Sequence, residues 1–327
     1  MKVIKDFSQF STLSEGLINN SVGWKNISHT QDVVLLETFL PYLGADVCGW
    51  LYAYSDTLEA HDDQPKYWLE RAMCRLMLST YLKTLVEITP NGALQTSKDD
   101  KAPAFKYKEL QYMSATLRQG YNFLEKGIML LESVENEAWM GSNYLRQQLL
   151  MRWVPWASDM SALSGVQVSR WDYERVVPAM DDISMIVISK IIPDDIRESM
   201  IIDYLQGNLS DKELKLFKLI QRAVTHLGIS EAVSRGWVQI TGGNVIATEV
   251  SNDAAYQTLK TAPGDGVSLK LRTHNLWGSE YVNAIITYML DHHDSFEDIV
   301  SHYRVTFPAK VSESCTYNNK GKGIFRL

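Results

Sequence analysis

The sequence predicts a mainly α-helical protein: a tandem duplicated helical-bundle module, with a small β-hairpin in each copy and an extended C-terminal tail. Apolar residues recur at helical spacing through most of the 327 residues. In the second half, two short apolar runs flank Gly242-Gly243. This pattern is typical of a tight hairpin, because glycine reaches the positive φ of primed turns. A similar phrase occurs once in the first half, and the repetition indicates a duplication.

Two pairs of similar phrases support the predicted duplication. The hairpin phrase of residues 86–96 aligns with residues 238–248. An upstream phrase around Pro41 aligns with one around Pro178, which requires an insertion in the second copy between its two phrases. Each copy is therefore expected to contain a proline-initiated helix, a second helix, a hairpin and a final helix.

The predicted organisation has five parts. They are an N-terminal arm docked on the body (1–29), a first helical repeat with a hairpin near 86–96 (30–154), a linker (155–168), a second helical repeat with a hairpin near 237–250 (169–307) and a C-terminal tail (308–327). The linker is placed where Ser, Ala and Gly are frequent. The tail loses helical periodicity but ends in an apolar cluster, which suits addition to another subunit's sheet or groove.

Local signals justify the individual helices. Pro41 and Pro178 are expected to begin helices, since proline is tolerated in the first turn. Leucines recur every seven residues within Phe105–Ser133, which predicts the longest helix. Ser210 and Glu213 form a capping box that begins another helix. The remaining helices are predicted at 30–40, from Trp68 to the first hairpin, and at 137–153, 194–205, 252–262 and around 281–289.

Composition and charge exclude several classes of function. An apolar content of 45% and a charged content of 22% are those of an ordinary globular protein. No continuous apolar run of membrane-spanning length is visible, so no membrane association is expected. The three cysteines lie far apart, which predicts neither a disulfide framework nor a zinc site, and indicates synthesis in a reducing cytoplasm. A net charge of −7 without long basic runs argues against tight nucleic-acid binding.

Two histidine-containing clusters raise the alternative of an all-helical metal-dependent phosphohydrolase. The first is Asp291–Asp294 with its adjacent His292 and His293, near His302. Its position at a helix end also suits the helix dipole, and this favours a structural role. The second is His61-Asp62, a pair that falls in a loop before a proline. Neither pattern amounts to a credible active site, and no cofactor is expected.

The layout resembles a family of head-to-tail connector (neck adaptor) proteins from tailed phages and prophages of Bacteroidetes. The most specific matches are Leu85–Leu94 and the following helix to Glu132. Val166–Tyr173, the phrase around Pro178 and Trp237–Val250 supply the rest. The resemblance covers most of residues 30–300. The second hairpin departs from the pattern, since Gly243-Asn244 replaces Asn91-Gly92 and no proline precedes it.

This resemblance implies a virion structural protein, made in the host cytoplasm, that forms a twelve-fold ring under the portal. Its implied partners are further copies of itself, the portal protein, further neck or tail proteins, and DNA that passes without specific binding. An acidic surface fits a ring that lets DNA through. The contacting residues are expected in the two hairpins and the tail: Val86, Ile88, Leu94, Trp237, Val238, Ile240, Val245, Ile246, Ile324, Phe325 and Leu327.

Overall fold

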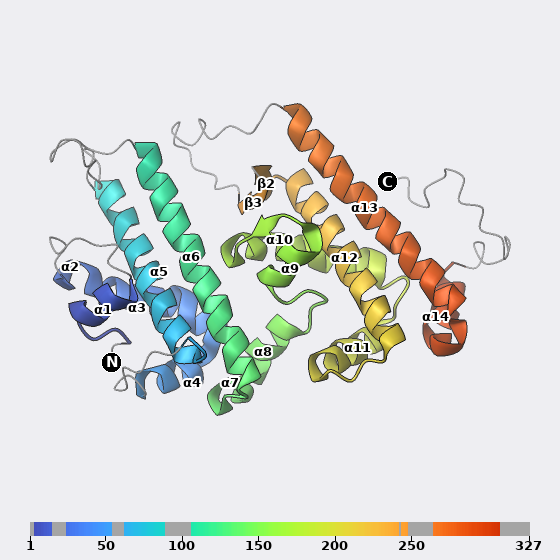
Figure 1. The fold of residues 1–327 in the computed structure, drawn as a ribbon, viewed down its shortest axis with the longest axis horizontal. Coiled ribbons are helices and arrows are strands. Elements are labelled where there is room, and N and C mark those ends of the chain that lie inside the picture. The colour runs from blue at the N-terminus through green and yellow to red at the C-terminus, as the bar shows by residue number, and fades with distance from the viewer. Residues whose placement is uncertain are drawn as a thin grey trace. The chain divides into compact units, whose positions relative to one another are not determined.

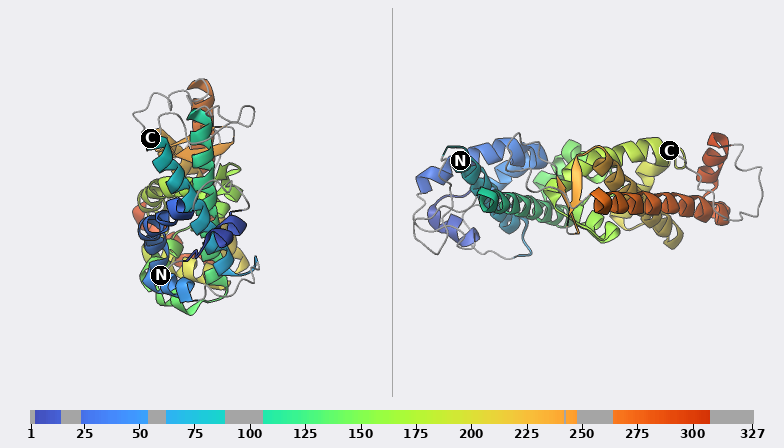
Figure 2. Two further views of the ribbon diagram at one scale, coloured as in Figure 1. Left: turned by 90° about the vertical axis from the view of Figure 1, so that its left-hand side faces the viewer. Right: turned by 90° about the horizontal axis from the view of Figure 1, so that it is seen from above.

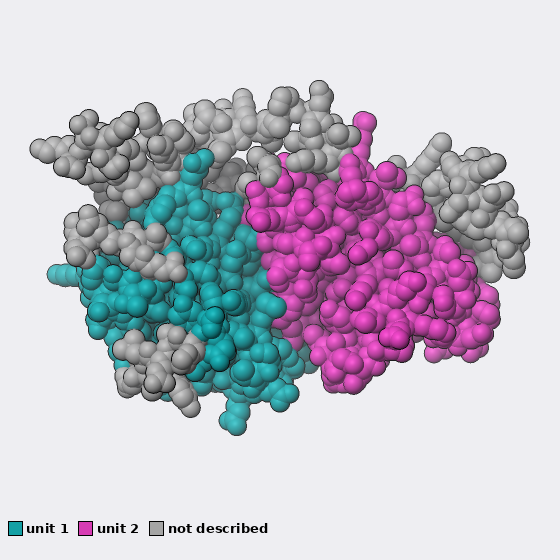
Figure 3. Space-filling model, viewed as in Figure 1, with its two compact units in different colours: residues 1–148, 169–171, 251–260 teal, residues 149–168, 172–250, 261–327 magenta. Residues whose placement is uncertain are grey.

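The computed structural model describes residues 3–14, 24–53, 62–88, 106–241, 243–247 and 264–307. These residues are mostly helical, with one small three-stranded sheet, as the sequence predicted (Figure 1). The chain divides into two compact units, which are described separately (Figure 3). Unit 1 contains residues 1–148, 169–171 and 251–260, and unit 2 contains residues 149–168, 172–250 and 261–327.

Unit 1 is organised around two long helices that lie side by side, α5 (Pro65–Ile88) and α6 (Lys106–Ser133) (Figures 1 and 2). The second of these confirms the helix that the heptad leucines predicted. The other elements are α1 (Phe7–Leu13), α2 (Trp24–Ser28), α3 (Thr30–Val34), η1 (Leu35–Phe39), α4 (Leu40–Ala53), α7 (Glu137–Gly141) and α8 (Asn143–Leu150). The single helix expected at 137–153 is thus two short ones, separated at Ser142.

Glycines allow α5 and α6 to approach closely. A Cβ at Gly127 would lie 2.6 Å from the side chain of Leu69, and one at Gly120 would lie 2.8 Å from that of Leu76. Real Cβ atoms do not approach carbon atoms this closely, so both leucines occupy space that only glycine leaves open. The two glycines of α6 therefore fix the packing distance in the centre of unit 1.

The N-terminal residues belong to the core of unit 1. Val3, Ile4 and Phe10 are fully buried, and the backbone N–H of Ile4 donates to Oε1 of Gln31 at 2.9 Å. Asp6 caps α1 by accepting from the backbone N–H of Gln9. Residues 3–14 therefore contribute directly to the core of the unit.

The segment α3–η1–α4 differs from the expected pair of helices that meet at Pro41. A π-helical segment, η1, joins α3 to α4, and the backbone leaves helical geometry at Gly44 instead, where φ is 79°. Proline lacks a backbone N–H, and a π-helical turn can accommodate the resulting irregularity. Pro178 likewise lies inside a helix and does not begin one.

One helical stretch among the described residues, Trp24–Ala53, is long and apolar enough to cross a membrane by length and composition alone. The sequence was not expected to contain such a stretch. It is divided among α2, α3, η1 and α4, and its Phe39, Leu43 and Val47 are fully buried. A core helix passes the same test, so the stretch by itself is weak evidence for a membrane span.

Unit 2 has its own pair of long helices, α12 (Asp211–Ser234) and α13 (Gly264–Asp291) (Figure 1). The capping box of Ser210 and Glu213 is present at the start of α12, as predicted. A Cβ at Gly278 on α13 would lie 2.5 Å from Leu227 on α12. The other helical elements are α9 (Ala157–Ser164), α10 (Arg170–Ile183), η2 (Ser184–Ile188), α11 (Asp194–Gln206), η4 (His293–Ser295) and α14 (Glu297–Thr306).

The predicted second hairpin is confirmed. Strands β2 (Val238–Thr241) and β3 (Asn244–Ala247) pair antiparallel, with Thr241 opposite Asn244 across a two-residue turn. Gly243 has φ of 85°, a conformation that favours glycine. A third strand, β1 (Gln167–Val168), pairs parallel with β3. The sequence did not predict this strand.

The expected linker at 155–168 is in fact structured, since it contains α9 and β1. Helix α9 packs against α12, and its Met160 is fully buried in the core of unit 2. The Ser- and Ala-rich composition that suggested a linker instead serves local hydrogen bonding. Ser161 Oγ accepts from the backbone N–H of Val168, and Ser164 Oγ donates to the carbonyl of Met160.

The first predicted hairpin is only partly within the described residues. Helix α5 continues through Ile88, so Val86 and Ile88 are helical and do not begin a strand. Leu94 and the rest of the phrase, the short helix expected at 252–262 and the tail at 308–327 lie outside the described residues.

The Gly127→Ala substitution should lower the free energy of unfolding by about 1–3 kcal/mol, because its methyl group must displace Leu69 in a packed core. Gly49→Ala provides the matched control, since Gly49 lies within helix α4 and a Cβ there meets nothing within 4 Å. It should leave stability unchanged or raise it by about 0.5–1 kcal/mol. Urea unfolding followed by circular dichroism measures both. Equal effects of the two substitutions would contradict the close helix packing.

A candidate binding pocket in unit 2

The hairpin residues expected to contact partners lie largely inside unit 2. Val238, Ile240 and Val245 are buried in its hydrophobic core, because one face of the small sheet packs against the helices. Trp237 is partly buried against the same core, and the guanidinium of Arg235 lies 4.8 Å from its ring centroid. These side chains pack within unit 2: Val238, Ile240 and Val245 are buried there, and the expected role of the hairpin at an interface stays a prediction.

The structure describes only some of the other residues that were expected to contact partners. The backbone of Ile246 pairs with that of Gln239 in the hairpin. The backbones of Val86 and Ile88 belong to α5, and their side chains are outside the described part of the structure. Leu94, Ile324, Phe325 and Leu327 also lie outside the described residues.

The histidines near the C-terminal end of α13 do not converge on one point. His292 Nδ1 lies 3.0 Å from the carbonyl oxygen of Tyr288, and exposed His293 pairs with Asp294 at 2.9 Å. His302 Nε2 instead lies 3.1 Å from the carbonyl oxygen of Ser189. Among the described residues, no group of three or more His, Cys, Asp or Glu side chains could hold a metal ion. His61 lies outside that part of the chain, and Asp62 is in an exposed turn.

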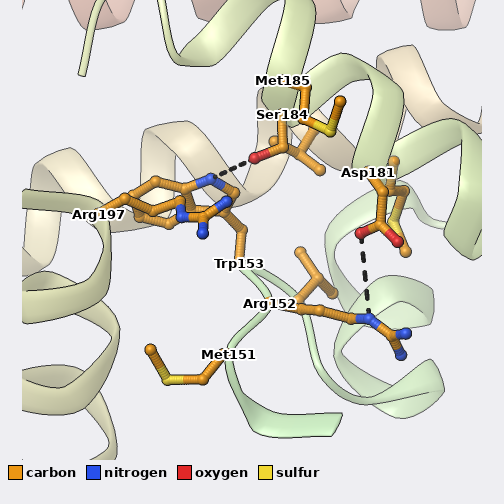
Figure 4. Close-up of a pocket in the computed structure, with 10 residues that line it drawn as sticks. Met151, Arg152, Trp153, Asp181, Ser184, Met185 and Arg197 are labelled. Atoms are coloured by element: carbon orange, nitrogen blue, oxygen red, sulfur yellow. Dashed lines mark hydrogen bonds and ion pairs between the residues drawn. The ribbon is translucent and has the colours of Figure 1, made fainter. Parts of the chain in front are cut away.

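A pocket of about 230 Å³ lies within unit 2 (Figure 4). Its lining comes from four parts of the fold: the segment before α9, the end of α10 with η2, helix α11 and helix α12. The lining residues are Met151, Arg152, Trp153, Val154, Met180, Asp181, Ser184, Met185, Arg197 and Val224. The indole N–H of Trp153 donates to Ser184 Oγ at 3.2 Å, which ties the ring to the first residue of η2.

Two arginines and one aspartate set the electrostatics of this pocket. Arg152 Nε lies 4.0 Å from Asp181 Oδ1, and the terminal nitrogens of Arg197 lie 3.8 Å from Asp194 and 3.9 Å from Glu198. All three distances exceed a hydrogen bond. Burial raises the pKa of the Asp181 carboxyl, and the charges of Arg152 and Arg197 partly oppose that rise. The pocket thus combines positive charge with an apolar wall.

The surface beside the pocket exposes apolar side chains on the π-helical segment η2. Met185, which also lines the pocket, is 67% exposed, and Ile186 is 55% exposed. π-Helical turns are frequent at functional sites because they displace side chains from the regular helical positions. In unit 1 another π-helical segment, η1, exposes Leu36, at 63%.

A second polar feature lies between the two long helices of unit 2. Nδ1 of His226 on α12 lies 2.8 Å from Nδ1 of His274 on α13, and both rings are buried. Tyr281 stacks on His226, and Arg222 donates to the Tyr281 hydroxyl at 3.3 Å. Burial, followed by the charges of His274 and Arg222, lowers the pKa of His226 to about 4. At neutral pH His226 is therefore uncharged, and the two rings share a buried hydrogen bond between the helices.

Sequence reasoning missed both features. The pocket residues Arg152, Asp181 and Arg197 are far apart in the sequence and match no motif. Only the cluster Met151–Val154, with its Arg-Trp pair ahead of a proline, offered a local signal. His226 and His274 are single residues on two helices whose pairing the sequence did not specify.

Together the two units define a mainly helical protein in which each unit is built on one pair of long helices. The chain belongs to a family of unknown function (DUF6712), whose model matches residues 40–148 and 188–301, about two thirds of the sequence. No curated protein matches the chain. No solved structure matches it either.

The stability of unit 2 should fall as the pH decreases from 6.5 toward 4. His226 is harder to protonate in the folded protein than in the unfolded chain, so protons favour unfolding within that window. Urea unfolding at pH 7 and pH 5 measures the effect. The double substitution of His226 and His274 by Phe should reduce this pH dependence, whereas Gly49→Ala should leave it unchanged. If the double variant had the same pH dependence of stability as wild type, the effect could not be assigned to His226.

Proposed function

We propose that the chain is a virion structural protein: a head-to-tail connector that forms a ring between the portal and the tail of a tailed phage. The observation that supports it best is the exposed apolar surface on the π-helical segments. Leu36 is the second residue of η1, and Met185 is the second residue of η2. Large apolar side chains exposed at like positions of two units suit repeated protein–protein contacts.

The proposed role rests on a duplicated module whose copies begin near residues 3 and 153. The separation of equivalent elements ranges from 146 residues (α5 at 65, α12 at 211) to 158 residues (α6 at 106, α13 at 264), as expected for tandem copies that differ by short insertions. Helix α1 corresponds to α9, and η1 corresponds to η2. The two segments matched by the family begin at 40 and 188. This register replaces the alignment of Pro41 with Pro178 and needs no large insertion between the two phrases.

The long helices supply a further parallel between the proposed copies. The first helix of each pair, α5 or α12, has 24 residues, and the second, α6 or α13, has 28. Gly120 packs under Leu76 in unit 1, and Gly278 packs under Leu227 in unit 2. The glycine is the fifteenth residue of the second helix in both pairs, which supports descent from one ancestral helix pair.

The proposed ring has twelve subunits and binds the portal on one side and further neck or tail proteins on the other. The protein is made in the host cytoplasm and becomes part of the virion. DNA passes through without specific binding, which the net charge of −7 favours, since an acidic lining repels phosphate within about 10 Å. No catalytic residue, metal or cofactor is part of this proposal.

Negative-stain electron microscopy of the protein, co-expressed with a candidate portal protein from a neighbouring gene, tests the proposal. Wild type should form a ring on the portal. The variant carrying both Leu36→Asp and Met185→Asp should fold normally but bind the portal or its neighbours more than about tenfold more weakly, because it buries charge in an apolar contact. Val305→Asp changes an 81% exposed apolar residue outside the π-helical segments and serves as the control.

Two results would contradict this proposal at different levels. If wild-type protein formed no ring and did not bind the portal, the connector role would be wrong. If the ring formed equally well with the double variant, the connector role would survive, but the π-helical surfaces would not be its contacts.

Removal of residues 308–327 provides a separate test of the tail. The proposed role of Ile324, Phe325 and Leu327 as a contact with a neighbouring subunit predicts that the truncated chain folds but assembles poorly. Particle infectivity and ring formation measure the outcome. Unchanged assembly and infectivity would remove the tail from the interface.

A further inference from the structure

We propose that the pocket between Arg152 and Arg197 binds a carboxylate carried beside an apolar side chain on a segment of a protein partner. This inference goes beyond the connector role and stands on the pocket alone, so either can fail without the other. The group that the pocket recognises is an acidic residue next to an apolar residue in the partner.

The guanidinium groups of Arg152 and Arg197 lie near carboxylates of the chain without hydrogen-bonding to them. Neither Arg152 nor Arg197 has a carboxylate oxygen within hydrogen-bond distance among the described residues; the nearest lie at 3.8–4.0 Å. Nε of Arg197 is buried and has no hydrogen-bond partner in that part of the chain. A guanidinium presents five N–H donors in a planar fork that matches a carboxylate. An entering carboxylate would pair with the guanidinium of Arg152 and with the terminal nitrogens of Arg197, whose nearest carboxylate oxygens lie beyond hydrogen-bond distance.

An apolar wall lines the other part of the pocket. Trp153, Met180 and Val224 are nearly fully buried and line the same cavity, together with Met151. Methionine side chains adapt to the shape of the group they contact. The wall can therefore accept an aliphatic or aromatic side chain next to the carboxylate.

Size favours a segment of a protein over a free metabolite. The cavity of about 230 Å³ is smaller than the roughly 300–1,000 Å³ typical of small-molecule sites. It continues into exposed Met185, beside exposed Ile186 on the protein surface. A small pocket within an exposed apolar surface is the usual arrangement for an anchor side chain at a protein interface.

Substitution of Asp181 should strengthen anion binding, whereas substitution of the arginines should weaken it. Asp181 lies beside Arg152 in the pocket, so it competes with an entering carboxylate for the same guanidinium (Figure 4). Replacing Asp181 by Asn removes the competing charge and keeps the shape. Binding of an anion should then become tighter, an effect that damage to the fold would not produce.

Titration of the full chain with phenylacetate and with neutral phenylacetamide tests the pocket chemistry. The indole N–H signal of Trp153 in a two-dimensional ¹⁵N–¹H spectrum reports occupancy, because that group lines the cavity and donates to Ser184. Phenylacetate should shift the signal saturably and bind at least fivefold more tightly than the amide. Asp181→Asn should tighten phenylacetate binding at least twofold.

Charge-removing variants define the site. The double substitution Arg152→Gln and Arg197→Gln should reduce phenylacetate binding to the level of the amide. Arg235→Gln is the control, since that guanidinium pairs with Asp182 at 2.7 Å and with Glu231 at 2.7 Å outside the pocket. It should leave the affinity unchanged. Spectral dispersion confirms that each variant is folded.

Peptide and phosphate probes identify the source of the carboxylate. N-acetyl-Asp-Phe-amide should shift the Trp153 signal and bind more tightly than N-acetyl-Asn-Phe-amide. Equal binding of phenylacetate and phenylacetamide, or the absence of a saturable shift, would overturn the proposal. Tighter binding of phenyl phosphate than of phenylacetate by tenfold or more would overturn the carboxylate assignment. If phenylacetate bound but the acidic peptide did not, the proposal that a protein partner supplies the carboxylate would be overturned.

Discussion

Close contact between two long helices is the interaction on which each unit depends. In α6 and α13, glycine replaces a side chain where a leucine from the partner helix must fit, at 2.5–2.8 Å from the missing Cβ. The helices can approach closely only because that volume is empty. The shorter helices then cover the faces that the pair leaves exposed, and their apolar residues complete each core.

The long-helix pair of unit 2 contains a buried polar contact, the hydrogen bond between His226 and His274. A buried polar pair of this kind stabilises the fold only while both partners are satisfied, so it restricts how α12 and α13 can slide along one another. The glycine–leucine contact fixes the distance between the helices, and the histidine pair fixes their register. Together these two contacts specify one arrangement of the unit.

Sequence reasoning recovered the features that depend on local spacing. The heptad leucines predicted α6, the Ser210 capping box predicted the start of α12, and the glycine pair predicted the β2–β3 hairpin. It failed where tertiary contacts decide. Strand β1 has only two residues, and it exists because β3 offers an edge. The alternating residues of the hairpin were expected at an interface, but their alternation reflects burial against the unit's own helices.

The sequence could not predict the pocket either, because tertiary packing also decides where its residues lie. Its charged residues come from the segment before α9, from α10 and from α11, and only the packing of these elements around α12 brings them together. In the proposed duplicated register, the first copy places Asp32 where the second has Asp181, and buried Cys48 where the second has Arg197. The acidic position is therefore shared, whereas an arginine stands at the Arg197 position only in the second copy. Two surfaces of common origin would in this way present similar apolar side chains from η1 and η2, yet differ in the charge beside them. In the proposed connector, such a difference would let the two related surfaces bind two different partners, as an adaptor between unlike assemblies requires.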